Sequence, residues 1–480
     1  MQAWKKICWR GLLLFLVLCG WIWPGGLCAR EDLPDPQETA GAETAAPLTL
    51  ADVINLALHD NRTLLSSSYG VESRQLSVDA AQSEFEWKLF PQATASASDE
   101  TRSLGGGVTV EKKFAPGPIA SVSPEIVRNY DGDSDETYGS VLGLSLTMPL
   151  LRGFGTDVNM DGVRTAEYSL RTARRSHYLV KVNTVLEAVA AVYNIVQQRE
   201  LTQMYADQTQ RFYGHVVMAQ AREKIGLATP IDVYRAKIRL KDVQDSLNRS
   251  QEALRNAGDR LKIVLATPLE QAVEVVAPLE WQPVDIGMGQ AVETALGHRV
   301  ELRQADDDLR EARRASRISR NGLRPQLDLV ANYTRLGNDD AFAGATTLDE
   351  EFWSVNLVST TDWSRTAEKA SYRQSLLAIK QVKLNRASRV DSIKREVRQY
   401  YEALQKARER MQIRKDQIDQ AAGKLALARI KFSHGMADNF DLVEAETELQ
   451  QARSDLLAAQ VEYIVGVYRL RAAIGTLIES

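Results

Sequence analysis

Two segments of the chain carry the same long pattern of large and small apolar positions. One heptad position is large in both segments: Val233, Leu240, Leu247, Leu254 and Leu261, then Leu442, Leu449, Leu456, Tyr463 and Leu470. The position three residues further on is mostly small: Ala236, Val243, Ser250, Ala257 and Val264, then Ala445, Ala452, Ala459, Gly466 and Ala473. This pairing of rows predicts two helices, each packed along its whole length against neighbouring helices.

A matching turn precedes each of these helices. The turns read Gly226-Leu-Ala-Thr-Pro-Ile-Asp232 and Gly435-Met-Ala-Asp-Asn-Phe-Asp441. Long stretches without proline lead into them, which predicts helices over about 158–225 and 364–433. At 1.5 Å per residue each would be roughly 100 Å long. The chain is therefore predicted to contain a long helical hairpin built twice.

Upstream of each hairpin the period of the pattern changes from helical to two. A helix of about thirty residues begins near Leu48, with Thr49 as its cap, and another begins near Met288. Beyond Pro91 and Pro325, alternating residues predict two pairs of strands of about ten residues, with one apolar and one polar face. That pattern is typical of membrane-spanning β-barrels. The links 104–136 and 338–350, rich in Gly and Asp, are predicted to be solvent-exposed loops.

The amino terminus indicates export. Lys5, Lys6 and Arg10 precede an apolar run, and Ala29 offers a small residue for cleavage, so residues 1–29 are predicted to be a signal peptide. All three cysteines lie before that cut. Lipidation of a cysteine is the alternative processing route, although Leu18 and Leu27 occupy places where a small residue is required. No later stretch is expected to resemble a membrane helix of ~20 continuous apolar residues.

The predicted domains are a leader at 30–47, a first repeat at 48–280 and a second repeat at 281–480. The leader is expected to be disordered because it is rich in Asp, Glu, Pro and Thr. The whole chain has a formal net charge of −4, which gives no argument for a nucleic-acid partner. Its five histidines are scattered, and no phosphate-binding loop is present. We therefore expect no metal site, no cofactor and no enzyme activity.

Four strands cannot close a barrel, because outer-membrane barrels need about eight or more. The chain is thus expected to oligomerise in a membrane, since open sheet edges are not tolerated in lipid. The strand starts at Leu89-Phe-Pro-Gln92 and Leu323-Arg-Pro-Gln326, the segment Met148-Pro-Leu-Leu-Arg-Gly-Phe-Gly155 and the two turns resemble the TolC family of outer-membrane efflux proteins. The resemblance covers about residues 48–480.

The resemblance implies a mixed α and β membrane protein with an internal duplication. In the family, a homotrimer forms a twelve-stranded outer-membrane β-barrel from four strands per chain, continuous with a long periplasmic α-helical barrel. The implied function is a passive exit duct for a tripartite efflux pump or type I secretion system. The implied partners are outer-membrane lipid, a periplasmic membrane-fusion adaptor and an inner-membrane RND or ABC transporter.

The resemblance also assigns roles to the two turns. The tips implied to dock the adaptor are Gly226, Leu227, Ala228, Thr229, Gly435, Met436, Ala437 and Asp438. The residues implied to form the periplasmic gate are Asp441, Glu444, Phe432 and Asp232. This chain departs from the family by having Glu at position 444.

Simpler explanations of these residues remain open. Thr229 to Asp232 and Asp438 to Asp441 both have the spacing of a capping box, which alone accounts for the two acids. Phe432 is equally suited to an apolar contact across its turn. A periplasmic coiled-coil adaptor or scaffold is the alternative function for the chain. It explains the heptads but not the paired strands.

Overall fold

The computed structural model describes residues 47–480 except 100, 132–135, 281–283, 285 and 479–480. The predicted signal peptide and nearly all of the leader lie outside the described residues. The first half of the described chain contains β1 (Leu48–Thr49), α2 (Leu50–Asp60), α3 (Arg62–Gln82), the 3₁₀ helix η1 (Ser83–Phe85), β2 (Trp87–Ala97), β3 (Thr101–Lys113), β4 (Ile119–Asp131), β5 (Glu136–Pro149), α4 (Thr156–Asn159), α5 (Asp161–Lys224) and α6 (Pro230–Leu265). The second half contains β6 (Val275–Val276), α7 (Met288–His298), α8 (Val300–Gly322), β7 (Asp328–Asp339), α9 (Phe342–Ala345), β8 (Glu350–Val358), α10 (Thr366–Ser433) and α11 (Asn439–Ile474).

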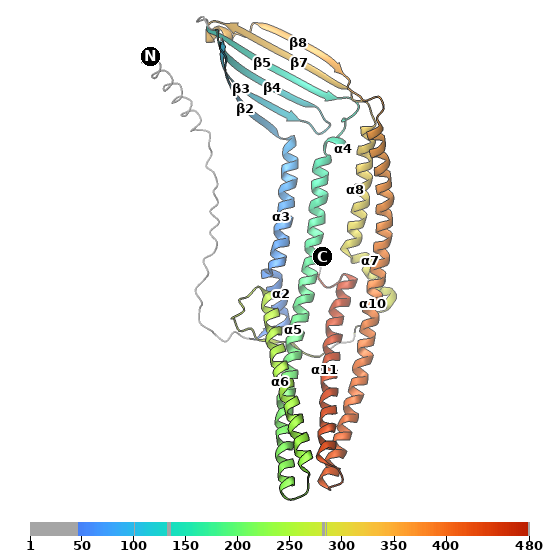
Figure 1. The fold of residues 1–480 in the computed structure, drawn as a ribbon. Helices are drawn as coiled ribbons and strands as arrows, with labels where there is room; N and C mark the ends of the chain where they lie inside the picture. The colour runs from blue at the N-terminus through green and yellow to red at the C-terminus, as the bar shows by residue number, and fades with distance from the viewer. Residues whose placement is uncertain (1–46, 100, 132–135, 281–283, 285, 479–480) are drawn as a thin grey trace, which may run out of the picture. The chain divides into compact units, whose positions relative to one another are not determined.

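Within residues 47–480, the sheet lies at one end of the long helices and the two hairpin turns lie at the other (Figure 1). The long helices α5 and α10 have 64 and 68 residues, close to the predicted ranges. Towards the sheet they pack against α3 and α8, and towards the turns against α6 and α11. Each half therefore contributes two helices near the sheet and two near the turns, and the short helices α2 and α7 pack against the long pairs between these levels. The boundaries of the two repeats remain a prediction.

The first predicted helix is interrupted once in each half. Thr49 caps α2 in a complete capping box with Asp52, as expected. The helix then breaks at Asn61, and the counterpart in the second half breaks at Arg299. The side-chain oxygen Oδ1 of Asn61 caps α3 by accepting from the Thr63 and Leu64 amides, while Nδ2 of the same side chain donates to Val264 O at 2.9 Å. Asn61 thus fixes both the break and its contact with α6.

An apolar cluster joins the two halves at the middle of the helices. It combines Val192 and Ile195 of α5 with Leu261 of α6 and with Val461 and Ile464 of α11. α5 contains an 18-residue window of mean hydropathy 1.5, which by length and composition alone is apolar enough to cross a membrane. The expectation that no later stretch resembles a membrane helix was therefore too strict. The α5 residues of this cluster pack against protein, so their apolar character is explained by the core.

Charged side chains join α5 and α8 nearer the sheet. The carboxylate of Asp307, only 4% exposed, pairs with Arg175 and with Arg310. Further along the same contact, Arg314 pairs with Asp161 of α5 and Glu311 of α8. The contact between the halves therefore changes from apolar at mid-helix to ionic near the sheet.

Among the described residues, the membrane-type sheet has six strands, not the four predicted. Its order is β2-β3-β4-β5-β7-β8, and every neighbouring pair is antiparallel. The four predicted strands are present as β2, β5, β7 and β8. The link 104–136, predicted to be an exposed loop, instead contributes β3 and β4 between β2 and β5, and the strand count of four per chain was wrong. The link 338–350 contains the short helix α9.

Asn61 offers a direct test of what holds the helix break. We expect Asn61→Ala to lower the free energy of unfolding by about 1–3 kcal/mol, because it removes the cap and leaves the Val264 carbonyl without its donor. Asn61→Ser is the matched variant, since serine caps equally well but does not reach Val264. Urea unfolding followed by circular dichroism should place Asn61→Ser between Asn61→Ala and the wild type. Equal losses for both variants would show that the cap contributes nothing.

Candidate functional site: the two hairpin turns

Both hairpin turns have the same backbone geometry. Gly226 and Gly435 adopt the left-handed conformation with φ of 74°. The amides of Leu227 and Met436 donate back to the carbonyls of Arg222 and Lys431 at 2.8 and 2.9 Å, which closes the preceding helix in each hairpin. Any residue with a side chain is strained at this φ, so glycine is required by the turn itself.

The two acids that begin the second helices differ in their bonding. Asp232 accepts hydrogen bonds from the Thr229 hydroxyl at 2.7 Å and from the Thr229 amide at 2.9 Å. These bonds lower the pKa of Asp232. In the second turn, Asp438 caps α11 by accepting from the Asp441 amide at 3.0 Å, but the described structure shows no return bond to the Asp441 carboxylate. The capping box predicted from sequence is therefore complete only in the first turn.

The structure brings the two turns together within one chain. A cavity of about 560 Å³ lies between them, lined by Leu227 and Ala228 from the first turn and by Met436 and Ala437 from the second. The side chains of Leu227 and Met436 are each 70% exposed. Thr229, Gly226, Gly435 and Asp438 are also exposed. Exposed apolar side chains at a helix end are suited to contact with another protein.

A line of acids runs from the second turn along one face of α11. Asp441 and Glu444 are exposed, and Glu448 follows one turn later. Lys424 of α10 binds Glu448 at 2.7 Å. That bond, together with the charges of Glu448, Glu444 and Asp441, raises the pKa of Lys424. On α6 the position of Glu444 is taken by Arg235, whose guanidinium lies over the ring of Phe440, so the acidic line belongs to the second hairpin.

Phe432 lies in the core of its hairpin. Its side chain packs in an apolar cluster with Leu425, Leu442 and Ala445 and is 8% exposed. The guanidinium of Arg222, from the other hairpin, lies 4.1 Å from the ring centroid. This placement fits the contact across the turn that the sequence left open. A role of Phe432 in gating stays a prediction.

A buried ionic triad near the turns was missed by the sequence analysis. Glu446 of α11, 7% exposed, accepts from Arg429 of α10 at 3.0 Å and bonds His215 Nε2 of α5 at 2.9 Å. Burial raises the pKa of Glu446, but the hydrogen bonds from His215 and Arg429 outweigh burial and leave its pKa below the ordinary value. The triad thus joins the second hairpin to the first through the buried carboxylate of Glu446.

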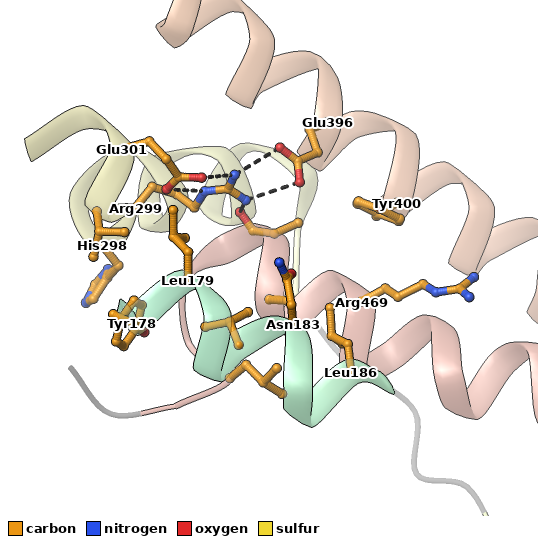
Figure 2. Close-up of a pocket in the computed structure, with 16 residues that line it drawn as sticks. Tyr178, Leu179, Asn183, Leu186, His298, Arg299, Glu301, Glu396, Tyr400 and Arg469 are labelled. Carbon is orange, nitrogen blue, oxygen red and sulfur yellow. Dashed lines mark hydrogen bonds and ion pairs between the residues drawn. The ribbon is translucent and has the colours of Figure 1, made fainter. Parts of the chain in front are cut away.

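A further cavity of about 270 Å³ lies far from the turns, at the break between α7 and α8. Figure 2 shows Arg299 at its centre, between Glu301 and Glu396. Arg299 also donates to Ala473 O at 3.1 Å, so it ties α8 to α10 and to the end of α11. The charged groups of Arg299, Glu301 and Glu396 pair with one another. We therefore interpret this cavity as part of the contact that connects α8, α10 and α11, and not as the functional site.

Comparison with known proteins agrees with this architecture. The profile of the outer membrane efflux protein family matches residues 53–267 and 291–476. Outer membrane efflux protein BepC of Brucella suis biovar 1 (strain 1330) is 22% identical over 368 residues, covering 76% of this chain and 78% of BepC.

Two solved outer-membrane channels have the same fold. The structure of CusC, which forms a transmembrane channel, matches with a TM-score of 0.69 and 14% identity over 92% of this chain and 95% of its own. The outer-membrane channel OprN matches with a TM-score of 0.69 and 16% identity over 89% and 90%. The fold and the two turns together place this chain in the class of channel proteins built from long helical hairpins and membrane strands. The chain belongs to the outer membrane efflux protein family, the TolC family, and is located in the outer membrane with an extension into the periplasm.

The buried triad predicts that two neighbouring glutamates, Glu446 and Glu448, differ in how much they contribute to the free energy of unfolding. Glu446→Ala should lower the free energy of unfolding by about 1–3 kcal/mol, because it leaves the buried His215 ring without its hydrogen-bond partner. Glu448→Ala, on the same helix but in an exposed pair, should change stability little. Urea midpoints at neutral pH would measure both.

The lowered pKa of Glu446 also makes the stability of the fold depend on pH. When folding lowers the pKa of a carboxyl group, that group stabilises the fold at any pH above its pKa in the unfolded chain. The contribution is lost as the pH falls through the pKa of the group in the folded protein. The stability difference between wild type and Glu446→Gln should therefore shrink as the pH falls below about 4.5, the ordinary value of this carboxyl. A difference that is independent of pH would contradict the ionic role of Glu446.

Proposed function

We propose that this protein is the passive outer-membrane exit duct of a tripartite efflux pump or a type I secretion system. It acts as a homotrimer whose periplasmic end is opened by an adaptor. The observation that carries the proposal is the acidic pair Asp441 and Glu444, exposed at the tip of one hairpin only. Three copies around an axis would place a ring of carboxylates at the periplasmic mouth. Like charges within a Debye length of about 8 Å attract cations and resist the passage of anions.

The partners follow from the same geometry. The exposed apolar residues Leu227 and Met436 present a docking surface on the tips for a periplasmic adaptor. The adaptor would in turn belong to an inner-membrane RND or ABC transporter, which supplies the energy for transport. The alternative, that this chain is itself a periplasmic adaptor or scaffold, does not fit a member of an outer-membrane channel family with a six-stranded antiparallel sheet.

The gate proposal predicts a change in ion conduction. Asp441→Asn combined with Glu444→Gln should raise single-channel conductance in planar bilayers and weaken block by multivalent cations, because the ring of charge is removed. Glu448→Gln, one turn further from the tip, is the matched control and should leave block unchanged. Asp232→Asn tests the first hairpin, where the carboxylate is already held by Thr229. Unchanged current in the double variant would remove the gate assignment.

The docking proposal predicts a loss of partner binding. Leu227→Ser with Met436→Ser should reduce copurification of the adaptor and pump with the full-length chain, because the exposed apolar contact is lost. Leu261→Val, within the core of the helices, serves as a control for mild destabilisation away from the tips. Trimer levels in the outer membrane are measured in parallel. Full adaptor recovery with the tip variant would place docking elsewhere.

A further inference from the structure

The six-stranded sheet ends in two open edges that match each other. β2 and β8 are the edge strands, and five consecutive antiparallel pairings make them run in opposite directions. An antiparallel sheet therefore continues without a break when β8 of one copy meets β2 of the next. Six strands are too few to close alone, and unpaired backbone groups cost several kcal/mol each in lipid. The occupant of each edge is thus a second copy of this chain.

We infer that the outer-membrane barrel of this protein has eighteen strands, six from each of three copies. The inference rests on the homotrimer proposed above, and it departs from the twelve strands expected from the family resemblance. Barrel diameter grows roughly linearly with strand number, so the pore would be about one and a half times as wide as a twelve-stranded one. Barrels of about 16 to 18 strands leave an open aqueous channel.

The first argument is that β3 and β4 carry the same faces as the rest of the sheet. One apolar row crosses all six strands in register: Leu89, Val110, Val122, Leu144, Tyr333 and Trp353. The adjacent row is polar across all six: Lys88, Glu111, Ser121, Ser145, Asn332 and Ser354. Neighbouring residues of a strand point to opposite faces. The hairpin β3–β4 therefore has an apolar face for lipid and a polar face for the lumen, as a wall strand needs.

The second argument is that the hairpin is bonded to the strands on both sides. On the polar face, hydroxyl pairs link β2 to β3, β3 to β4 and β4 to β5: Ser96 with Ser103 at 2.7 Å, Thr109 with Ser123 at 3.1 Å, and Ser121 with Ser145 at 2.7 Å. Glycine allows the strands to approach closely here. A Cβ at Gly105 would lie 2.6 Å from Thr94 Oγ1, and one at Gly107 would lie 2.7 Å from Pro124 O.

The third argument is that the turn of the hairpin is fixed at its helical end. The turn at 114–118 lies at that end of the sheet, where Pro116 O accepts from the Gly155 amide at 2.9 Å. On the other side, Lys112 donates to Phe85 O at 2.5 Å and Lys113 pairs with Glu84 at 2.6 Å, both in η1. The hairpin is therefore tied to the segments that lead into β2 and out of β5. Figure 1 shows β3 and β4 in line with the other strands.

The helices below keep their neighbours despite the two added strands. α3 and α5 remain side by side, joined by Ser67 and His177 at 2.6 Å and by Gln75 and Arg174 at 3.3 Å. In each chain, six strands thus stand over four helices. The membrane end widens while the helical tube keeps twelve helices in the trimer. The narrowest part of the inferred duct then lies at the periplasmic tips and not in the membrane.

The mature chain is predicted to lack cysteine, so single labels can report the two faces of β4. Spin labels at Val122→Cys and Ser121→Cys would be compared with Leu144→Cys and Ser145→Cys in β5. Oxygen, which is lipid-soluble, should relax the labels at 122 and 144 more than a water-soluble nickel complex does. That ratio should reverse at 121 and 145. Strong nickel access at 122 would place the hairpin outside the wall and overturn the inference.

Single-particle imaging of the purified full-length protein in lipid nanodiscs counts chains and strands together. Three chains enclosing eighteen strands are the expected result. Three chains with a twelve-stranded wall, and β3–β4 outside it, would overturn the wide barrel and leave the proposed duct intact. Two chains enclosing twelve strands would overturn the proposed trimer as well. The two failures are thus distinguishable in one image.

Discussion

The rest of the structure depends on one constraint: the edges of the sheet must be paired before the sheet can lie in lipid. Within one chain, β2 and β8 each leave a row of backbone donors and acceptors open. No side chain can satisfy such a row in a bilayer, so copies of the chain must supply the partners. In the proposed trimer, each edge would meet the opposite edge of its neighbour in a rotational arrangement. The same rotation would bring the hairpin tips around a common axis.

A different constraint applies to the helices. Helices of 64 and 68 residues need other helices packed along their whole length. The apolar cluster at mid-helix holds α5, α6 and α11 together and gives a fixed centre. Towards the sheet the contact between α5 and α8 is ionic. Towards the tips the two hairpins meet through the His215–Glu446–Arg429 triad and through Val443 of α11, which packs in the apolar cluster of the first hairpin. The two halves are therefore joined by apolar packing at mid-helix and by largely buried ion pairs on either side of it.

The long helices, the Thr49 cap and the two glycine turns could be predicted because each depends on residues close together in sequence. The hairpin β3–β4 was missed for a physical reason. Gly105 to Gly107 and Pro124 are typical of loops, and here they serve close approach between strands instead. Barrel strands also carry a weak signal, because only every second residue is apolar. The buried triad was invisible for another reason: His215 and Glu446 are 231 residues apart, and only the packing of the two hairpins brings them together.

The capping boxes show how a duplicated motif can separate two roles. In the first turn, Thr229 binds the Asp232 carboxylate, so this acid is occupied in holding the helix start. In the second turn, Asp438 is the cap, and it binds the Asp441 amide rather than the Asp441 carboxylate. The cap in the second turn therefore leaves the following acid exposed. Because Glu444 continues the acidic face where the first hairpin has Arg235, the second hairpin concentrates negative charge at the tips while the first does not. If the membrane end is as wide as inferred above, this asymmetry favours the proposed gate at the tips as the narrowest part of the proposed duct.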